Sequence, residues 1–424
     1  MEYGLIGEHL SDSFTKFIHE RIASYFSNKC SDYKDYKYEV HELRAEQVKE
    51  YLHASRFKGI NVAAPYQQTV IPYLDEISDQ AREIGAVDTI INRGGRLCGY
   101  NTAYFAMADL LQYSGTDPAG KKVLILGTGE GSSTAYAAVK NQGAAEIHVA
   151  GFTGGEGTLT CEQTYEKCAD AEIIINTTPF GMSPDLDVLP IKPELFTKLC
   201  GLLDLIDDPL RTSLVLEAQK RGIPAQGGLY MRVMKEIHSF RLFTGSDISP
   251  EESRRIYQEI LNSRRNIVLT GMSLAGKTTL GTLVSGKLGR RLEDTDLMII
   301  DREKREITDI FATDGEPYFR NLESAMCREL AAEKGIVIAT GGGAILREEN
   351  VDALKKNGFI IFLDRPLDQL MPASDRPLAD TKEKVAALLE KRYPIYRSTC
   401  DGSISNDKTP EDGAEKILSL LDMI

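Results

Sequence analysis

A glycine-rich segment that ends in lysine and threonine has residue types and spacing suited to chemistry. It reads Gly271-Met272-Ser273-Leu274-Ala275-Gly276-Lys277-Thr278, follows the apolar run 266–270 and precedes a helical pattern over 280–288. Glycines at this spacing let backbone N–H groups turn toward phosphate oxygens, and the following helix N-terminus adds partial positive charge. The lysine would reach the β- and γ-phosphates, and the threonine hydroxyl would bind Mg²⁺. We therefore predict a nucleotide site here rather than a chance glycine turn.

Two carboxylates lie a short distance downstream of this segment. Asp294 and Asp296 alternate along a β-prone stretch, which would place both side chains on the same side of an extended chain. One could hold Mg²⁺ through a water molecule while the other accepts the proton of a substrate hydroxyl, as phosphoryl transfer requires. A solvated acidic turn is the alternative for this stretch alone. All six histidines precede residue 250, so carboxylates and cations must supply the chemistry of this half.

Arginines and glycines form a second group of candidates. Arg320 could form a forked pair with a carboxylate, and Glu323, one helical turn later, could orient it. A surface ion pair is the alternative for these two residues. The three glycines 341–343 follow an apolar strand pattern and favour close approach of the backbone to a ligand. Arg376 and Arg392 supply two further cations.

In this order, these motifs resemble those of the shikimate kinase family over about residues 265–424: the phosphate loop, D-x-D, G-E-x-x-F-R-x-x-E, G-G-G, R-P-L and R-x-P-x-Y. The resemblance implies a small P-loop kinase with a parallel sheet that phosphorylates the 3-hydroxyl of shikimate with ATP and Mg²⁺ in aromatic amino-acid (chorismate) biosynthesis. The residues it implies are Lys277 and Asp296 for catalysis; Leu274, Ala275, Gly276, Lys277, Thr278, Thr279 and Arg376 for ATP; Asp296, Arg320, Gly342 and Arg392 for shikimate; and Thr278 with Asp294, through water, for the metal. The segment 371–375 is shorter and less basic than the usual lid of the family. A gluconate-type kinase is the alternative, and the paired arginines argue against it.

The composition of the whole chain fits a soluble globular protein. A chain of 424 residues is too long for one ordinary core, so two or three domains are expected. The net charge of −13, without a basic block, argues against a nucleic-acid partner. We find no signal-peptide pattern and no apolar run of the ~20 residues that a membrane helix needs. Seven scattered cysteines fit free thiols, so we expect a cytoplasmic location.

A second strand–loop–helix unit lies in the N-terminal half. The strand pattern 121–126 leads into the glycine-rich loop 127–132, a helical pattern begins at Ser133, and the strand pattern 146–150 follows about twenty residues after the loop begins. This spacing predicts an α/β fold with a dinucleotide-binding Rossmann half. Short strand and helix patterns before residue 100 indicate a separate lobe.

The N-terminal half resembles shikimate dehydrogenase over residues 1–246. The runs that carry the resemblance are Leu5-Ile6-Gly7 with Ser13-Phe14-Thr15, and the segments 59–62, 85–87, 99–102, 176–182 and 208–212. The resemblance implies a substrate lobe over about 1–103, a Rossmann lobe over 104–227 and returning helices over 228–246. A linker helix over 247–263 would then lead into a kinase domain over 264–424.

Several working residues of that family are changed. Its catalytic lysine falls on Gln67 and its partner aspartate on Ala103, and neither an amide nor a methyl group can exchange a proton near neutral pH. A threonine hydroxyl is replaced by Ala63, and a substrate-binding asparagine by Asp88, which would bring a carboxylate to an anionic ligand. We assign the substrate-binding glutamine of the last helices to Met234.

The cofactor side is changed as well. Glu130 lies in the loop that should meet a pyrophosphate, where its charge adds repulsion, and the run Gly151-Phe152-Thr153 lacks the arginine that would hold an NADP 2′-phosphate. We expect a domain that kept its fold, lost its hydride chemistry and binds NADP poorly. The alternatives are a bifunctional dehydrogenase–kinase, an enzyme with shifted chemistry, a regulatory module for another ligand, and an oligomerisation domain.

Overall fold

The chain divides into two compact units in the computed structural model, which describes residues 3–10, 14–27, 33–54, 56–151, 157–371 and 381–422. One unit is Met1–Ile260 and the other is Leu261–Ile424. The division lies within helix α10 (Pro250–Arg264), a few residues before the expected start of the kinase domain at 264. The Ser249 hydroxyl accepts a hydrogen bond from the Glu252 backbone N–H at 3.2 Å, which stabilises the start of this helix.

The first lobe of the N-terminal unit is a six-stranded mixed sheet in the order β2-β1-β3-β5-β6-β4. Its strands are β1 (Tyr3–Gly7), β2 (Tyr38–Glu42), β3 (Gly59–Val62), β4 (Glu76–Ile77), β5 (Thr89–Arg93) and β6 (Arg96–Tyr100). Its helices are α1 (Phe14–Ser27), α2 (Ala45–Ala54), α3 (Tyr66–Thr69), α4 (Asp79–Ile84) and the 3₁₀ turn η2 (Ile71–Tyr73). Strands β1, β2 and β3 run parallel, so the loops after β1 and β3 meet at one sheet edge.

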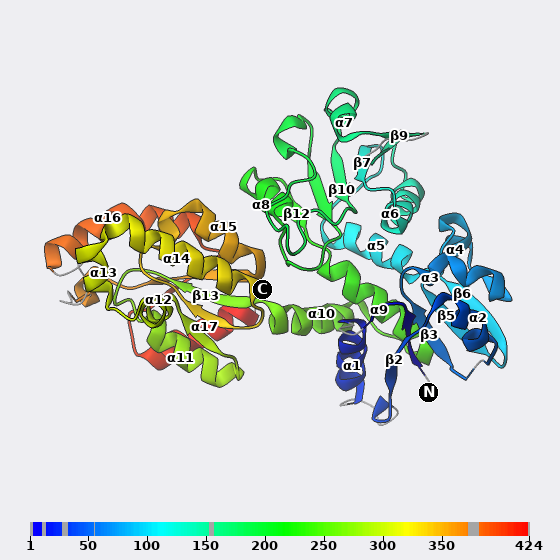
Figure 1. The fold of residues 1–424 in the computed structure, drawn as a ribbon, viewed down its shortest axis with the longest axis horizontal. Helices are drawn as coiled ribbons and strands as arrows, with labels where there is room; N and C mark the ends of the chain where they lie inside the picture. Colours follow the sequence, from blue (N-terminus) through cyan, green and yellow to red (C-terminus); the bar gives the residue numbers. More distant parts are fainter. Residues whose placement is uncertain are drawn as a thin grey trace. The chain divides into compact units, whose positions relative to one another are not determined.

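The second lobe is a parallel six-stranded sheet in the order β12-β11-β10-β7-β8-β9, as the Rossmann prediction requires (Figure 1). Its strands are β7 (Lys122–Leu126), β8 (Glu146–Ala150), β9 (Thr158–Leu159), β10 (Ile173–Asn176), β11 (Gly201–Asp204) and β12 (Ala225–Gln226). Its helices are α6 (Glu130–Asn141), α7 (Cys161–Lys167), α8 (Ser213–Lys220) and the 3₁₀ turn η3 (Pro193–Leu195). Helix α5 (Thr102–Tyr113) leads into this lobe, and α9 (Leu229–Thr244) returns from it and packs against α5, α1 and β3.

The C-terminal unit is a parallel five-stranded sheet, β14-β15-β13-β16-β17, which confirms the α/β prediction (Figure 1). Its strands are β13 (Asn266–Thr270), β14 (Leu292–Asp294), β15 (Val337–Ala339), β16 (Gly358–Asp364) and β17 (Gly402–Ser405). Its helices are α11 (Lys277–Leu288), α12 (Thr295–Glu303), α13 (Ile307–Thr313), α14 (Gly315–Ala332), α15 (Glu348–Asn357), α16 (Lys382–Thr399), α17 (Pro410–Asp422) and the 3₁₀ turns η4 (Ala344–Leu346) and η5 (Leu367–Gln369).

The apolar strands of this sheet form its core and bring the candidate loops together. Val268, Leu269, Ile360 and Ile361 are fully buried between the helical layers. Because carboxyl ends of parallel strands meet at one sheet edge, the loops after β13, β14 and β15 lie side by side. That edge carries the phosphate loop, the acidic pair and the triple glycine.

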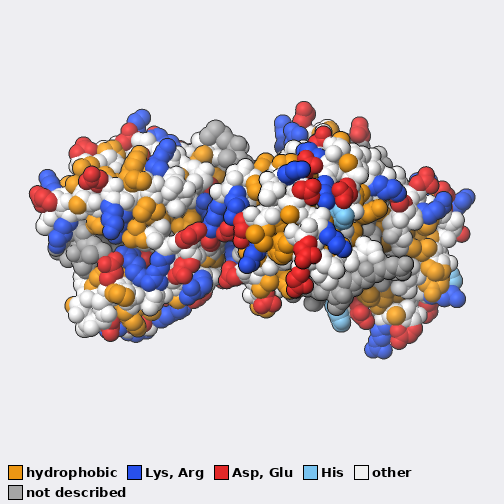
Figure 2. All heavy atoms as spheres, turned by 90° about the horizontal axis from the view of Figure 1, so that it is seen from above, with side chains coloured by type: hydrophobic (Ala, Val, Ile, Leu, Met, Phe, Trp, Pro, Cys, Tyr) orange, Lys and Arg blue, Asp and Glu red, His pale blue; other side chains and the backbone are white. Residues whose placement is uncertain are grey.

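The face drawn in Figure 2 carries charges of both signs, and the described helices include no membrane span. Lysine and arginine are interspersed with aspartate and glutamate over the face drawn in Figure 2. Within the described ranges, every helix is too short or too polar to cross a bilayer. The cytoplasmic location and the absence of nucleic-acid partners stay predictions.

Candidate functional site

The phosphate loop has the backbone conformation of an anion cradle. Gly271 has φ 147° and Gly276 has φ 89°, both in the region that favours glycine, and Leu274 also has a positive φ, 65°. The Lys277 Nζ donates to the carbonyl oxygens of Gly271 at 3.0 Å and Met272 at 2.8 Å. The amine is therefore held over the inside of its own loop, next to the N-terminus of α11, where phosphate oxygens would bind.

The acidic pair is arranged differently from the sequence-based expectation. Strand β14 ends at Asp294 and α12 begins at Thr295, so Asp296 lies on the first turn of a helix and not on an extended chain. The Asp294 carboxylate caps this helix, because its Oδ1 accepts from the Asp296 N–H at 2.9 Å, and its Oδ2 accepts from the Thr278 hydroxyl at 2.6 Å. A carboxylate and a hydroxyl brought together in this way fit Mg²⁺, which takes oxygen ligands and usually relies on one or two carboxylates plus substrate phosphates.

Arg320 and Glu323 form a buried ion pair, which excludes the alternative of a surface pair. The Arg320 Nη1 donates to Glu323 Oε2 at 2.7 Å, and Arg320 also donates to Glu316 Oε1 from Nε at 3.1 Å and from Nη2 at 3.0 Å. Arg320 is 8% exposed and Glu323 is fully buried. Burial raises the pKa of Glu323, with Asp296 adding to the rise and Arg320 opposing it. Glu316 is the first glutamate of the G-E-x-x-F-R-x-x-E motif, four residues before Arg320 on one helix, but we assigned it no role from the sequence.

The triple glycine makes room for the side chains of the site. A Cβ atom on Gly341 would lie 2.5 Å from Glu323 Oε1 and 2.7 Å from Asp296 Oδ1. A Cβ atom on Gly343 would lie 2.5 Å from the Arg320 Cζ. The glycines were expected to allow close approach of a ligand, and the structure adds a second reason: charged side chains already lie against their Cα atoms.

Arg392 reaches the same glycines from α16. Its Nη1 donates to the Gly342 carbonyl at 3.1 Å, and the Tyr396 hydroxyl donates to the same oxygen at 2.5 Å. Gly342 also lies beside the phosphate loop, because a Cβ atom there would be 3.0 Å from the Ser273 hydroxyl. The structure thus brings all four proposed shikimate contacts together; Arg376 lies outside the described residues.

Two residues that the sequence did not indicate also lie at the phosphate loop. The Asn406 side chain donates to the Ala275 carbonyl at 2.7 Å and ties the loop after β17 to the phosphate loop. Arg365, at the end of β16, has a guanidinium nitrogen 3.7 Å from where a Gly276 Cβ would be. Neither residue belongs to a recognisable motif in this sequence, so no local signal could have found them.

The N-terminal unit has a cavity of about 530 Å³ at the edge of its first sheet. Its lining includes Thr15, Ala63 and Gln67, three of the positions at which the dehydrogenase resemblance places substrate or catalytic contacts. Helix α9 adds Arg232 and Lys235 to the lining. Ser13 lies outside the described residues.

Asp88 is not directed at a ligand, which corrects the expectation of repulsion. Its carboxylate is fully buried and accepts four hydrogen bonds: from the Thr102 N–H at 2.8 Å, the Thr102 and Thr89 hydroxyls at 2.9 Å each, and the Ala103 N–H at 2.9 Å. Two of these donors are backbone groups in the first turn of α5, where a negative charge is favourable. Asp88 therefore fixes the start of α5.

Met234, the position assigned to the family's substrate-binding glutamine, does not face the cavity. Met234 is 3% exposed and does not line the cavity, whereas its neighbour Lys235 does. A one-residue difference turns a helical side chain by about 100°, so sequence alone could not fix the register.

The cavity lining also includes a buried acid of α9, Glu236, beside the cations Arg232 and Lys235. The Glu236 carboxylate lies 3.3 Å from His19 Nε2 and 3.8 Å from Arg232 Nε. Burial alone would raise the pKa of Glu236, but the His19 hydrogen bond and the charges of Lys235 and Arg232 outweigh it and lower the pKa to about 2. Glu236 is thus ionised at neutral pH and lies close to Arg232 as part of the cavity lining.

Glu130 is the first residue of α6, three residues earlier than the predicted helix start. The pKa of Glu130 is raised to about 6, mainly by burial. The positive charge of Lys235 opposes this rise, and the negative charge of Asp88 adds to it. Its carboxylate is therefore largely charged at neutral pH and occupies the helix end that would meet a pyrophosphate. Phe152 and Thr153 lie outside the described residues.

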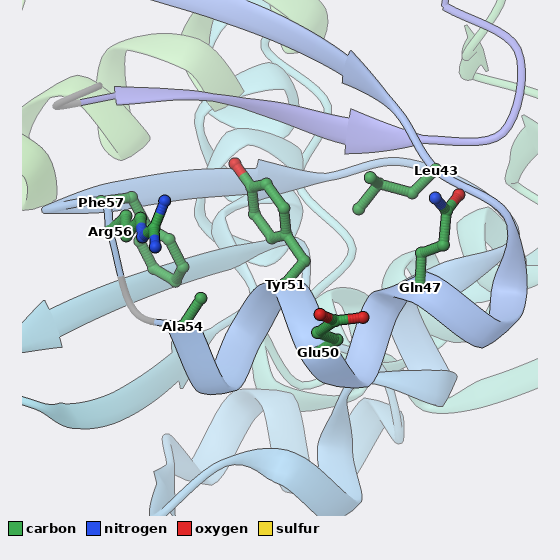
Figure 3. Close-up of a pocket in the computed structure, with 7 residues that line it drawn as sticks. All are labelled: Leu43, Gln47, Glu50, Tyr51, Ala54, Arg56 and Phe57. Atoms are coloured by element: carbon green, nitrogen blue, oxygen red, sulfur yellow. The ribbon is translucent and has the colours of Figure 1, made fainter.

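A second hollow of about 530 Å³ lies along α2. Figure 3 shows Tyr51 on α2 between Leu43 and Gln47 at one end and Arg56 and Phe57 at the other. It contains none of the predicted site residues. In the part of the chain that the structure describes, no group of three or more metal-ligating side chains is present in this hollow or elsewhere.

The geometry defines the C-terminal unit as a P-loop phosphotransferase and the N-terminal unit as a two-lobed, Rossmann-type dehydrogenase fold. Family models agree: the model described as shikimate kinase matches residues 273–422, and the shikimate dehydrogenase substrate binding domain matches residues 5–90. The N-terminal part of the chain belongs to the shikimate dehydrogenase family and the C-terminal part to the shikimate kinase family.

Individual relatives match each half. A shikimate dehydrogenase (NADP(+)) of Bacillus cereus is 31% identical over 274 residues, covering 61% of this chain and 98% of the relative. A shikimate kinase of Clostridium beijerinckii is 43% identical over 149 residues, covering 34% of this chain and 88% of the relative. The crystal structure of a chorismate mutase/shikimate 5-dehydrogenase fusion protein from Clostridium acetobutylicum superposes with a TM-score of 0.56 at 28% identity, covering 61% of this chain and 96% of that one.

Proposed function

We propose that the C-terminal unit transfers the γ-phosphoryl group of ATP to the 3-hydroxyl of shikimate. The observation that supports this most directly is the cluster of Arg320, Arg392 and Asp296 around the glycine segment 341–343, beside the phosphate loop. Two arginines suit the carboxylate of a substrate, and a neighbouring carboxylate suits a substrate hydroxyl. A gluconate-type substrate also has a carboxylate, and the assay below separates the two.

Within this proposal each residue has a defined task. Lys277 would exchange its loop carbonyls for phosphate oxygens and neutralise the charge that develops during transfer. Asp296 would accept the proton of the attacking hydroxyl. Thr278 and Asp294 would hold Mg²⁺, which neutralises phosphate oxygens when bound. The remaining proposed ATP contacts are Leu274, Ala275, Gly276, Thr279 and Arg376.

We further propose that the N-terminal unit does not oxidise shikimate with NADP⁺. Gln67 lines the cavity at the position of the family lysine, and Ala103 has no group that could hold a proton. Acid–base participation contributes about 10²–10⁴-fold to such reactions. Glu130 adds a charge unfavourable to a pyrophosphate, so NADP binding should be weak.

An active bifunctional dehydrogenase–kinase is the second candidate. It is favoured by the 31% identity that extends over 98% of a relative named as an NADP-dependent shikimate dehydrogenase. A third candidate is a non-catalytic N-terminal module that binds a ligand or forms an oligomer.

Two assays on the full chain separate these candidates. Shikimate-dependent formation of ADP from ATP is expected, with gluconate as the competing substrate, and no NADPH is expected from shikimate and NADP⁺. The double variant Gln67→Lys, Ala103→Asp should not recover normal dehydrogenase activity, because the neighbouring positions are changed too. Robust NADPH formation by the unmodified chain would overturn the second proposal without affecting the first.

A further inference from the structure

Two cations on one face of α9 line the N-terminal cavity. Arg232 and Lys235 are three residues apart, so their side chains project in the same direction, and both are part of the cavity lining. Each lies beside a buried carboxylate: Arg232 Nε lies 3.8 Å from Glu236, which is itself part of the cavity lining, and Lys235 Nζ lies 3.9 Å from Asp88.

The charge of Lys235 is not needed to stabilise Asp88. That carboxylate already accepts four hydrogen bonds at 2.8–2.9 Å, two of them from backbone N–H groups at a helix N-terminus. At 3.9 Å the lysine makes no hydrogen bond to it, and the lysine side chain is 17% exposed. Lys235 therefore brings a positive charge to the cavity lining, near the carboxylates of Asp88, Glu130 and Glu236.

Arg232 presents a second positive charge next to a hydroxyl. Its Nη2 donates to the Thr15 hydroxyl at 2.8 Å, and its side chain is 36% exposed. Arg232 shares the Glu236 carboxylate with two other groups: His19 Nε2 lies 3.3 Å from it, and the Thr15 hydroxyl donates to it at 3.3 Å. The planar guanidinium suits a carboxylate, while the ammonium group of a lysine suits a phosphoryl group as a point charge.

The rest of the lining limits the size and type of ligand. The cavity of about 530 Å³ fits a small molecule, Gln67 and Asn61 provide polar groups, and Leu5 and Val62 provide apolar walls. A ligand with one carboxylate would use only one of the two cations. A phosphoryl group carries about −1.5 to −2 charges at neutral pH and would use the second.

We propose that this cavity is a binding site for a small hydroxylated carboxylate that also carries a phosphoryl group, held by Arg232 and Lys235. The product of the proposed kinase reaction, shikimate 3-phosphate, has this chemistry, so the choice of probe rests on the proposed function. The N-terminal unit would then sense the product made by the C-terminal unit.

Isothermal titration calorimetry on the full chain tests this proposal. Arg392→Ala is present throughout to weaken binding at the kinase site. Shikimate 3-phosphate and shikimate are each titrated into this protein and into versions that also carry Lys235→Met or, as a matched control, Lys16→Met. Lys16 is an exposed α1 residue 3.8 Å from Glu20 and outside the cavity lining.

We expect shikimate 3-phosphate to bind at least tenfold more tightly than shikimate, and Lys235→Met to abolish that preference while Lys16→Met keeps it. Equal binding of the two probes, or an unchanged preference in Lys235→Met, would overturn the proposal. Because synthetic shikimate 3-phosphate is used, the result does not depend on whether the C-terminal unit makes it. The ADP assay reports on that activity separately.

Discussion

Replacing Gly343 with alanine should damage shikimate recognition and leave ATP binding intact. The new Cβ atom would lie 2.5 Å from the Arg320 Cζ, whereas carbon atoms pack at about 3.5–4.0 Å. The guanidinium must therefore move by about 1 Å. It is held by Glu323 at 2.7 Å and Glu316 at 3.0 Å, so the movement also strains a buried ion pair.

The expected cost follows from this displacement. A shift of about 1 Å in a positioning group can cost about 10²-fold, equivalent to about 2.7 kcal/mol of transition-state stabilisation. We therefore expect kcat/KM for shikimate to fall about 100-fold, measured by initial rates with shikimate varied at saturating ATP. The KM for ATP should stay within about threefold, because the three atoms nearest the added methyl group all belong to Arg320 and none to the phosphate loop.

Gly286→Ala is the matched control. Gly286 is an exposed residue of α11, and an added Cβ meets no atom within 4 Å, so this change should leave both kinetic constants unaltered and stabilise the helix by up to about 1 kcal/mol. Near-normal shikimate kinetics in Gly343→Ala would refute the argument that Arg320 binds the substrate from its observed position. Equal loss of ATP and shikimate binding would show that the substitution disturbs the whole site.

Four further outcomes can be checked. Lys277→Ala should reduce phosphoryl transfer by at least about 10²-fold, and near-normal turnover would show that the catalytic assignment is wrong. Arg392→Ala should weaken shikimate binding in calorimetry with little effect on ATP, and loss of both ligands would mean a structural role. The pKa of Glu130 is raised to about 6, so its carboxylate is charged at pH 8 and largely protonated at pH 5. Glu130→Gln should therefore strengthen NADP⁺ binding at pH 8 but not at pH 5. Equal effects at both pH values would contradict this explanation. The pKa of Glu236 is lowered from 4.5 to about 2, so its charge stabilises the fold above pH 4.5, by about 3 kcal/mol, and that stabilisation is lost as the pH falls toward 2. Glu236→Gln should lower the melting temperature of the N-terminal unit at pH 7, with a difference that narrows on acidification, and a pH-independent difference would refute the assignment.

The sequence predicted the architecture well because both units rely on local patterns. Glycine spacing and the strand–loop–helix order are set by backbone geometry, so the phosphate loop at 271–278 and the Rossmann half followed directly. The grouping of Arg320 with Arg392 came from the family resemblance. Both side chains reach the glycines 341–343 because parallel strands bring distant segments to the same edge of the sheet.

Side-chain direction was the part that could not be predicted. Asp296 was placed on an extended chain because nothing local shows that Asp294 caps a helix. Lys235 was missed in favour of Met234 because helix register, and not composition, decides which side chain faces the cavity. Arg365 and Asn406 reach the phosphate loop from separate strands, so only tertiary structure reveals them.

The burial of Asp88 makes this residue difficult to replace, even by asparagine. A carboxylate can accept on both oxygens, and here one oxygen accepts from the Thr102 N–H while the other accepts from the Ala103 N–H. The asparagine implied by the family resemblance would turn an NH₂ group toward one of these donors. Because Asp88 is fully buried, an NH₂ group facing a backbone N–H there would cost about 1–3 kcal/mol, so the acid at this position also anchors the start of α5.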